Sequence, residues 1–139
     1  MDIFLGVIVI LFAHFVADFV FQPHYIASTK SYSISALIQH IIIYALSFYI
    51  IFGIAWYPLY YLMEIKIAAQ VWLQLTIGIT VVNSLLHYFI DFFTSKITKY
   101  FWDKKDYHNF FVVIGFDQLL HLSLLVFSYA QMLNNFQYI

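Results

Sequence analysis

Apolar residues gather in four long runs that are separated by short polar segments. The runs cover residues 3–21, 36–55, 67–92 and 110–130. Each run is long enough to cross about 30 Å of hydrocarbon as an α-helix. No alternation of apolar and polar residues typical of β-strands stands out. The pattern predicts an all-α polytopic membrane protein, an up-down bundle of four transmembrane helices in a single domain over residues 1–139.

Proline and polar residues mark where the predicted helices end. Pro23 ends the first helix, because proline cannot extend the helical hydrogen-bond ladder. We expect polar loops at residues 28–35 and 96–109, and an interfacial turn at residues 56–66. The first apolar run follows no basic segment and precedes no small-residue cleavage site. We therefore interpret it as a retained first helix and not as a signal peptide.

Composition supports the membrane interpretation and narrows the function classes. Of the 139 residues, 64% are hydrophobic and only 9% are charged, whereas a soluble domain carries about 25% charged residues. The net charge of −1 provides no basic field for nucleic acid. Because the chain has no cysteine, disulfides and thiolate metal sites are excluded. The partner that composition implies is the lipid bilayer, and nucleic acid is not expected.

The lysines predict how the helices are oriented. Five of the six lysines fall in the first and third predicted loops, and only Lys66 falls in the second. Cytoplasmic loops carry an excess of lysine and arginine. We therefore expect a multi-pass protein of the bacterial inner (cytoplasmic) membrane, with loops 1 and 3 in the cytoplasm and both termini outside. The five lysines are Lys30, Lys96, Lys99, Lys104 and Lys105.

Histidine and aspartate recur inside the predicted helices, where each aspartate costs about 2.5–3.5 kcal/mol on insertion scales. Three helices each carry one His and one Asp four residues apart, a spacing that places both side chains on one helix face. The second helix carries one histidine. The pairs are His14 with Asp18, His87 with Asp91, and Asp117 with His121, and the additional histidine is His40.

An up-down chain brings all of these residues to the cytoplasmic leaflet. His precedes Asp in the first and third helices, and Asp precedes His in the fourth, which runs the other way. In every pair the aspartate is thus nearer the cytoplasm and the histidine deeper, about 6 Å apart at 1.5 Å per residue. Independent placement of polar residues would seldom produce this mirror order.

Such a cluster indicates metal chemistry, because His and Asp are typical ligands of zinc, iron and manganese. We expect a divalent metal, zinc before iron or manganese. A metal-bound water would be the nucleophile, and His40, Asp18 or Asp91 would be the general base. A purely structural hydrogen-bond network is the alternative interpretation. The expected metal ligands are His14, Asp18, His87, Asp91, Asp117 and His121.

Three further polar residues border the predicted site. Gln22 extends the first-helix stripe of His14 and Asp18 by one turn. Lys30 and Lys96 are most simply anchors on the cytoplasmic side. Both also border the site, so either lysine is a candidate contact for an anionic headgroup or a phosphate.

The motifs resemble a known family over almost the whole chain. They are His14-x-x-x-Asp18-x-x-x-Gln22, His40, His87-x-x-x-Asp91 and Phe116-Asp117-Gln118-x-x-His121. This set resembles the small bacterial and phage membrane proteins grouped as domain of unknown function 3307, in which a lysine often follows the third motif, as Lys96 does here. The resemblance implies a four-helix fold and a polar intramembrane site that includes Gln118, and it implies no activity.

Three functions are compatible with these residues. The first is a membrane-embedded metal-dependent enzyme, a hydrolase of a lipid or another membrane-borne substrate. The second is a proton or metal-ion transporter or channel that uses the same cluster. The third is a structural or regulatory membrane protein. The chain has few small residues for close helix packing, so a homodimer is a further expectation.

Overall fold

The computed structural model describes residues 3–58 and 68–136, and within these ranges every regular element is a helix. The predicted all-α class is therefore confirmed. The elements are α1 (Ile3–Phe15), η1 (Val16–Val20), α2 (His24–Thr29), α3 (Ile34–Phe48), η2 (Tyr49–Ala55), α5 (Ala69–Asp103) and α6 (Tyr107–Phe136). The π-helical segments η1 and η2 directly continue α1 and α3.

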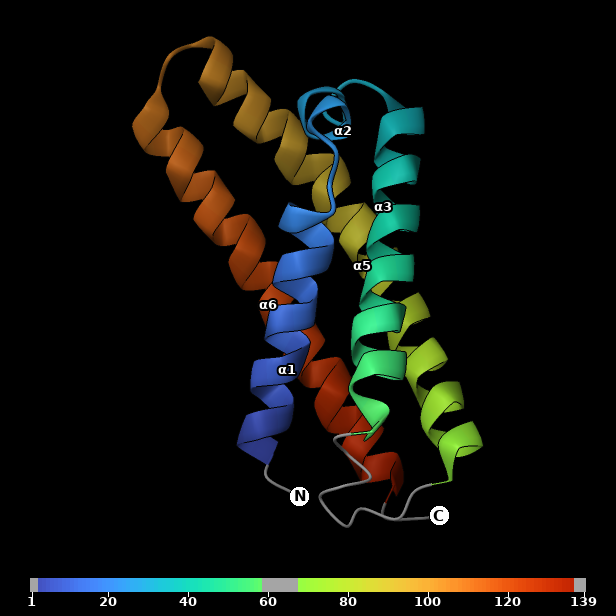
Figure 1. Ribbon diagram of the computed structural model, residues 1–139. Coiled ribbons are helices and arrows are strands. Elements are labelled where there is room, and N and C mark those ends of the chain that lie inside the picture. Colours follow the sequence, from blue (N-terminus) through green and yellow to red (C-terminus); the bar gives the residue numbers. More distant parts are fainter. Residues whose placement is uncertain (1–2, 59–67, 137–139) are drawn as a thin grey trace.

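Successive long helical segments run in alternating directions (Figure 1). α5 and α6 form an antiparallel hairpin and contact each other extensively, while α3 packs on α5 and on η1, and α1 packs on α6. The short helix α2 lies at the same end of the molecule as the turn between α5 and α6. That end is where η1 finishes, α3 begins and the two arms of the hairpin are joined.

Three helical segments are long and apolar enough to cross a membrane: Ile34–Ala55, Ala69–Asp103 and Tyr107–Asn134. The first apolar segment, Phe4–Val20, is shorter, and at 1.5 Å per residue it extends roughly 26 Å. Large apolar side chains on all these segments face outward, as Phe12, Leu85 and Phe127 do. This outward apolar surface suits hydrocarbon as the surrounding solvent.

The third and fourth helices extend well beyond their apolar cores. The predicted loop at residues 96–109 is wrong for most of its length, because α5 continues to Asp103 and α6 begins at Tyr107. An ion pair of 2.7 Å between Lys99 and Asp103 supports this polar helical end. Hydropathy predicts the apolar stretch of a helix and carries no signal for a polar continuation of the same helix.

A three-residue turn joins the two long helices. Lys105 adopts a positive φ of 58°. Asp106 then caps α6 by accepting hydrogen bonds from the backbone and side chain of Asn109, at 3.2 and 2.7 Å. These bonds lower the pKa of the Asp106 carboxyl below its ordinary value.

Two other predicted boundaries are also revised. The loop predicted at residues 28–35 includes the end of α2 and the start of α3, where the Ser33 hydroxyl accepts a hydrogen bond from Ala36 N at 3.3 Å. Pro23 lies after the first helix, as predicted, and starts α2 as its N-cap. The interfacial turn predicted at residues 56–66 falls largely outside the described residues, as does Lys66.

The half of the bundle opposite α2 has an aromatic core. Phe48, Phe52, Trp72 and Tyr129 are almost fully buried and pack ring against ring. The indole N–H of Trp72 donates a 2.7 Å hydrogen bond to the carbonyl oxygen of Gly53, which ties η2 to α5. This rigid half holds the helices at fixed spacing below the polar residues.

Gly53 is required for this close approach of helices. A Cβ atom at Gly53 would lie 2.7 Å from Thr76 Cγ2, whereas a Cβ at Gly78 would meet nothing within 4 Å. We predict that Gly53→Ala lowers the free energy of unfolding in detergent by about 1–3 kcal/mol, because η2 and α5 must separate. Gly78→Ala, the matched control, should be neutral or stabilising by up to about 1 kcal/mol. Equal unfolding free energies for the two variants would contradict this packing.

Candidate metal centre

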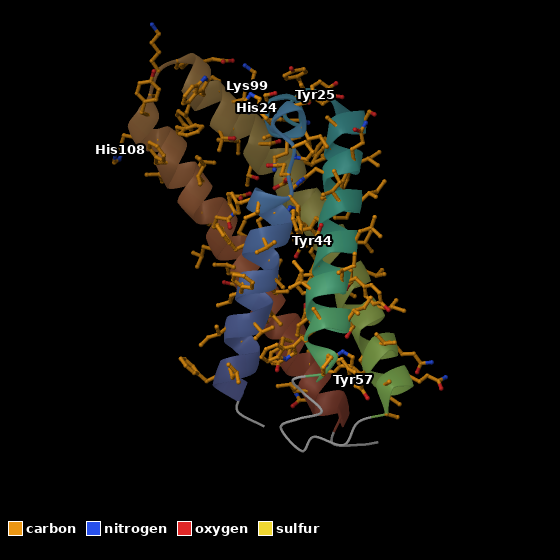
Figure 2. The ribbon with its side chains drawn as sticks, in the orientation of Figure 1. His24, Tyr25, Tyr44, Tyr57, Lys99 and His108 are labelled. Atoms are coloured by element: carbon orange, nitrogen blue, oxygen red, sulfur yellow. The ribbon has the colours of Figure 1, made fainter. Side chains whose placement is uncertain are left out.

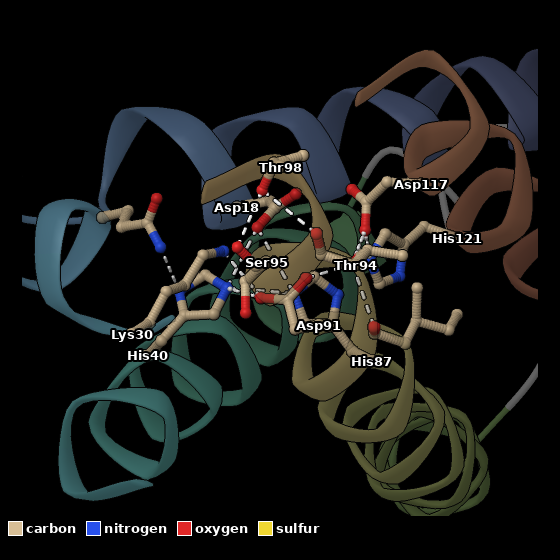
Figure 3. A network of polar contacts seen from close by, with 12 residues as sticks. Asp18, Lys30, His40, His87, Asp91, Thr94, Ser95, Thr98, Asp117 and His121 are labelled. Atoms are coloured by element: carbon tan, nitrogen blue, oxygen red, sulfur yellow. Dashed lines mark hydrogen bonds and ion pairs between the residues drawn. The ribbon is translucent and has the colours of Figure 1, made fainter. Parts of the chain in front are cut away.

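Seven ionisable side chains from five helical elements converge on one polar cluster, and Figure 3 labels all of them except His14. All are buried except Asp117, whose side chain is 15% exposed. We call this group the His/Asp cluster. Its members are His14 from α1, Asp18 from η1, His40 from α3, His87 and Asp91 from α5, and Asp117 and His121 from α6.

The centre of the cluster is the contact between two imidazoles. The Nε2 atoms of His40 and His87 lie 2.9 Å apart. An oxygen of Asp18 lies 3.1 Å from the first and 3.3 Å from the second. An oxygen of Asp91 lies 3.2 and 3.6 Å from the same two atoms. Two nitrogen and two carboxylate donors thus surround one point, an arrangement typical of metal ligands.

A second group of donors shares His87 with the first. His121 Nε2 lies 3.3 Å from the other Asp91 oxygen and 3.4 Å from Asp117 Oδ1. The rings of His87 and His121 stack with centroids 4.0 Å apart. The triplets Asp18–His40–His87 and His87–Asp91–His121 each bring their ligand atoms within 4.8 Å of one another. These buried His and Asp groups could hold a metal ion.

His14 lies at the edge of the cluster. Its Nε2 is 3.8 Å from Asp18 and, among the described residues, has no hydrogen-bond partner although it is buried. Its Nδ1 lies 3.1 Å from the Tyr44 hydroxyl, which can accept the Nδ1 proton. With the proton on Nδ1, His14 Nε2 carries a lone pair on the side of Asp18, as the nitrogen of a metal-ligating histidine does.

A local change of helix type positions Asp18. The N–H of Phe21 bonds to the carbonyl of Val16 at 2.9 Å, which is the i to i+5 contact of a π-helical turn. The wider turn places Asp18 against His40 of α3 and keeps it near His14. π-Helical turns are rare and are frequent at functional sites.

Amide and hydroxyl groups orient the ligands from outside. Gln22 Nε2 lies 2.8 Å from His40 Nδ1. With its amide rotated by half a turn, the Gln22 oxygen would accept the Nδ1 proton and leave Nε2 free for a metal. Gln118 donates to Asp117 at 3.0 Å and lies 3.4 Å from Asp18, and the Thr94 hydroxyl donates to Asp117 at 2.5 Å. Such contacts fix ligand orientation.

One of the two lysines expected near the site reaches it. Lys30 Nζ contacts an Asp91 oxygen at 2.6 Å. Lys96 lies elsewhere, exposed and with its ammonium 3.4 Å from the Phe92 ring centroid. The structure thus brings Gln22, Gln118 and Lys30 to the cluster and leaves Lys96 outside it.

The sequence analysis did not single out three residues that lie one helical turn beyond the cluster, one on α3 and two on α5. Tyr44 lies one turn after His40, in the middle of the bundle (Figure 2), and stacks on His87 at 4.3 Å. Thr94 and Ser95 follow Asp91 by about one turn and are buried. The same four-residue spacing that identifies the His–Asp pairs could have identified Tyr44 and Ser95.

A cleft of about 620 Å³ opens above the cluster, between η1 and α2 on one side and the α5–α6 hairpin on the other. Asp18, Asp91 and Asp117 form its floor. The carboxylates therefore face a space that a water molecule or a substrate can enter. Residues of α2 and of the turn after it, such as Ser28 and Tyr32, line the cleft, which therefore lies towards the end of the molecule where α2 lies (Figure 1).

Thr94 provides a test of how the Asp117 carboxylate is held. Thr94→Val removes a hydrogen bond to a charged group at nearly constant volume, so we predict a loss of about 1–3 kcal/mol in unfolding free energy. Thr98→Val is the matched control, since the Thr98 hydroxyl bonds only to backbone carbonyls of α5. Its loss should stay below about 1 kcal/mol. A Thr98 variant as destabilised as the Thr94 variant would argue against a specific role of Thr94.

A comparison with family models supports the family resemblance of the motifs. No curated protein and no solved structure matches the chain. One family model, described as "Protein of unknown function (DUF3307)", matches residues 7–139, nearly the whole chain, including every member of the His/Asp cluster. The chain belongs to this family of proteins of unknown function.

Proposed function

We propose that this protein is a membrane-embedded metal-dependent enzyme that hydrolyses a lipid or another membrane-borne substrate. One observation carries the proposal: at a cleft, two imidazole nitrogens lie 2.9 Å apart, and two carboxylate oxygens each lie within 3.6 Å of both nitrogens. A cluster that served only to join helices would not need an opening of this size. Buried ionisable groups in membrane helices are by default functional.

In this proposal the chain crosses the membrane four times. The segment Phe4–Val20 spans roughly 26 Å and contacts two of the longer spans, α3 and α6. Hydrocarbon of about 30 Å accommodates a somewhat short helix by local thinning. The lysine bias orients the cleft towards the cytoplasm of a bacterial or phage-infected cell, with both termini outside.

The central ligands would be Asp18, His40 and His87, with Asp91 between the two donor groups. His121, together with His87 and Asp91, would complete a second position, so the cluster has donors for one or two ions. Zinc is the metal that this nitrogen and oxygen donor set suits first, with iron and manganese as alternatives. When bound, a metal of this kind lowers the pKa of a water molecule towards neutrality and polarises the substrate.

The geometry favours a ligand role for His40, because its Nε2 lies in the centre of the cluster. A residue that lines the cleft is then a better candidate for the general base. Asp117 lines the cleft and is the most exposed of the three aspartates. Its carboxylate would take a proton from water, while Thr94 and Gln118 hold it in position.

We predict that the purified protein contains about one or two equivalents of a divalent metal per chain, measured by mass spectrometry after metal supplementation. His87→Ala and Asp91→Ala should each weaken metal binding by more than about tenfold. His108→Ala is the matched control, because His108 is exposed on α6 outside the cluster (Figure 2). Unchanged metal content in both cluster variants, with both still folded, would contradict the proposed metal centre.

One observation favours transport as a second candidate function. A buried polar stripe on α5 extends from His87 away from the cleft through Ser84, Asn83, Thr80 and Thr76. The hydroxyls of Thr80 and Ser84 have no hydrogen-bond partner among the described residues. Beyond this stripe, however, the aromatic core is closely packed, and its described residues provide no polar path.

Ion flux distinguishes the two candidates. We predict that proteoliposomes containing the protein show no proton or zinc flux above that of empty liposomes, because the aromatic core blocks the far half of the bundle. The measurement uses fluorescent indicators for pH and for zinc trapped inside the vesicles. A flux that the His87→Ala variant abolishes would support transport and overturn the enzyme proposal.

A further inference from the structure

The lining of the cleft above the His/Asp cluster has a polar part, which we call the polar wall, and an apolar part, which we call the apolar wall. Thr94, Ser95 and Thr98 of α5 lie along the polar wall, and Lys30 faces them from the turn after α2. We propose that this cleft binds the phosphate group of an amphiphile, with Lys30 and Ser95 as the residues that hold it. The inference rests on the proposed metal-dependent hydrolase and specifies its substrate class.

Ser95 supplies an unused hydrogen-bond donor. The residue is 9% exposed and lines the cleft, yet its hydroxyl has no hydrogen-bond partner among the described residues. Ser95 follows Asp91 by one helical turn on α5, and both residues line the cleft (Figure 3). Buried polar groups are nearly always hydrogen-bonded, so the unpaired, buried hydroxyl of a residue that lines the cleft is a candidate donor to a ligand there. Its neighbours Thr94 and Thr98 already donate to other groups.

Lys30 supplies the positive charge. Its ammonium contacts the Asp91 carboxylate at 2.6 Å, and three histidine nitrogens also lie within 3.6 Å of that carboxylate. A metal ion bound through Asp91 would compete with Lys30 for the carboxylate oxygens. The ammonium would then be available, next to the metal, for an anion in the cleft.

Charge balance favours an anionic ligand once two metal ions are present. Three carboxylates and one ammonium give the cleft floor a formal charge of −2 with the histidines neutral. One divalent cation cancels this charge and two reverse it. A phosphate group compensates the excess positive charge and presents several oxygens to Lys30, to Ser95 and to the metal centre.

The apolar wall suits a hydrocarbon chain. Phe19 of η1 lies on one side of the cleft, and Phe110 and Ile114 of α6 lie on the other. Phe19 is 48% exposed and therefore faces both the cleft and the surrounding lipid. A chain that leaves the cleft between η1 and α6 would enter the hydrocarbon directly, while its phosphate stays at the polar wall.

The reaction that follows is hydrolysis of a phosphate monoester. The oxygen of water forms a bond to phosphorus, and the bond from phosphorus to the ester oxygen breaks. Asp117 takes the proton from water and returns it to the departing oxygen, so the products are an alcohol and inorganic phosphate. No oxidant or further co-reactant is needed.

Binding of a non-hydrolysable probe tests the inference. The protein is purified in nonionic detergent and supplied with zinc, and n-octylphosphonate is titrated by calorimetry beside octanol and methylphosphonate. We expect n-octylphosphonate to bind at least about tenfold more tightly than either comparison ligand, because each lacks one of its two recognised parts. Equal affinity for octanol would overturn the phosphate assignment. Equal affinity for methylphosphonate would overturn the amphiphile assignment and indicate a free phosphate as ligand.

Variants locate the binding residues. Lys30→Met should weaken n-octylphosphonate binding by about 10- to 100-fold, and Ser95→Ala by about three- to tenfold. Lys30→Arg should retain most of the affinity, which separates loss of charge from loss of folding. Lys96→Met is the matched control outside the cleft and should leave the affinity within about twofold of the original. If Lys30→Met and Lys96→Met bind equally well, the inference is wrong.

Metal content, measured on the same samples, separates this inference from the proposed function. Protein that holds metal but shows no preference for n-octylphosphonate would refute the phosphate inference and leave the metal centre standing. Protein that holds no metal but binds n-octylphosphonate through Lys30 would refute the metal enzyme while supporting the anion site.

Discussion

Three carboxylates buried at one level of an apolar bundle are the constraint on which the rest of the structure depends. An unpaired charge inside a membrane is costly, and Asp18, Asp91 and Asp117 all lie within 3.8 Å of cationic or imidazole nitrogens. The segments that carry these nitrogens must therefore meet at the level of the carboxylates, since no single segment carries enough nitrogen partners for all three. A breach in the cluster would leave a buried charge without compensation, which is far more damaging than loss of an apolar contact.

The two halves of the molecule differ in how closely their helices pack. In the aromatic half, the helices pack closely around buried side chains, and the Trp72 indole donates a hydrogen bond to the Gly53 carbonyl oxygen. In the other half the segments separate enough to leave a cleft of about 620 Å³, and the long polar end of α5 provides its wall. Rigid support on one side and an opening on the other are what a site for chemistry requires. The π-helical turn at Asp18 is the local adjustment that joins the two halves on the first helix.

The sequence was sufficient to predict the all-α class, the apolar cores of the long helices and the meeting of the seven cluster residues, because helical spacing and alternating direction are simple geometry. It did not reveal where α5 and α6 end, since their polar continuations carry no hydropathy signal. Nor could it distinguish Lys30 from Lys96: both border the site in sequence, but only the turn after α2 carries its lysine to Asp91. Tyr44, Thr94 and Ser95 support the cluster through ordinary side chains that, one at a time, are unremarkable in a membrane helix.

Anomalous diffraction from crystals grown with zinc or manganese, recorded on both sides of the absorption edge of the metal, tests the central claim most directly. We expect a strong anomalous peak between Asp18, His40 and His87, with a second position beside His121 where two ions bind. Metal-replete crystals that show no peak in the His/Asp cluster, with His40 and His87 still in mutual contact, would contradict this claim. The cluster would then be a hydrogen-bonded network that serves the fold alone.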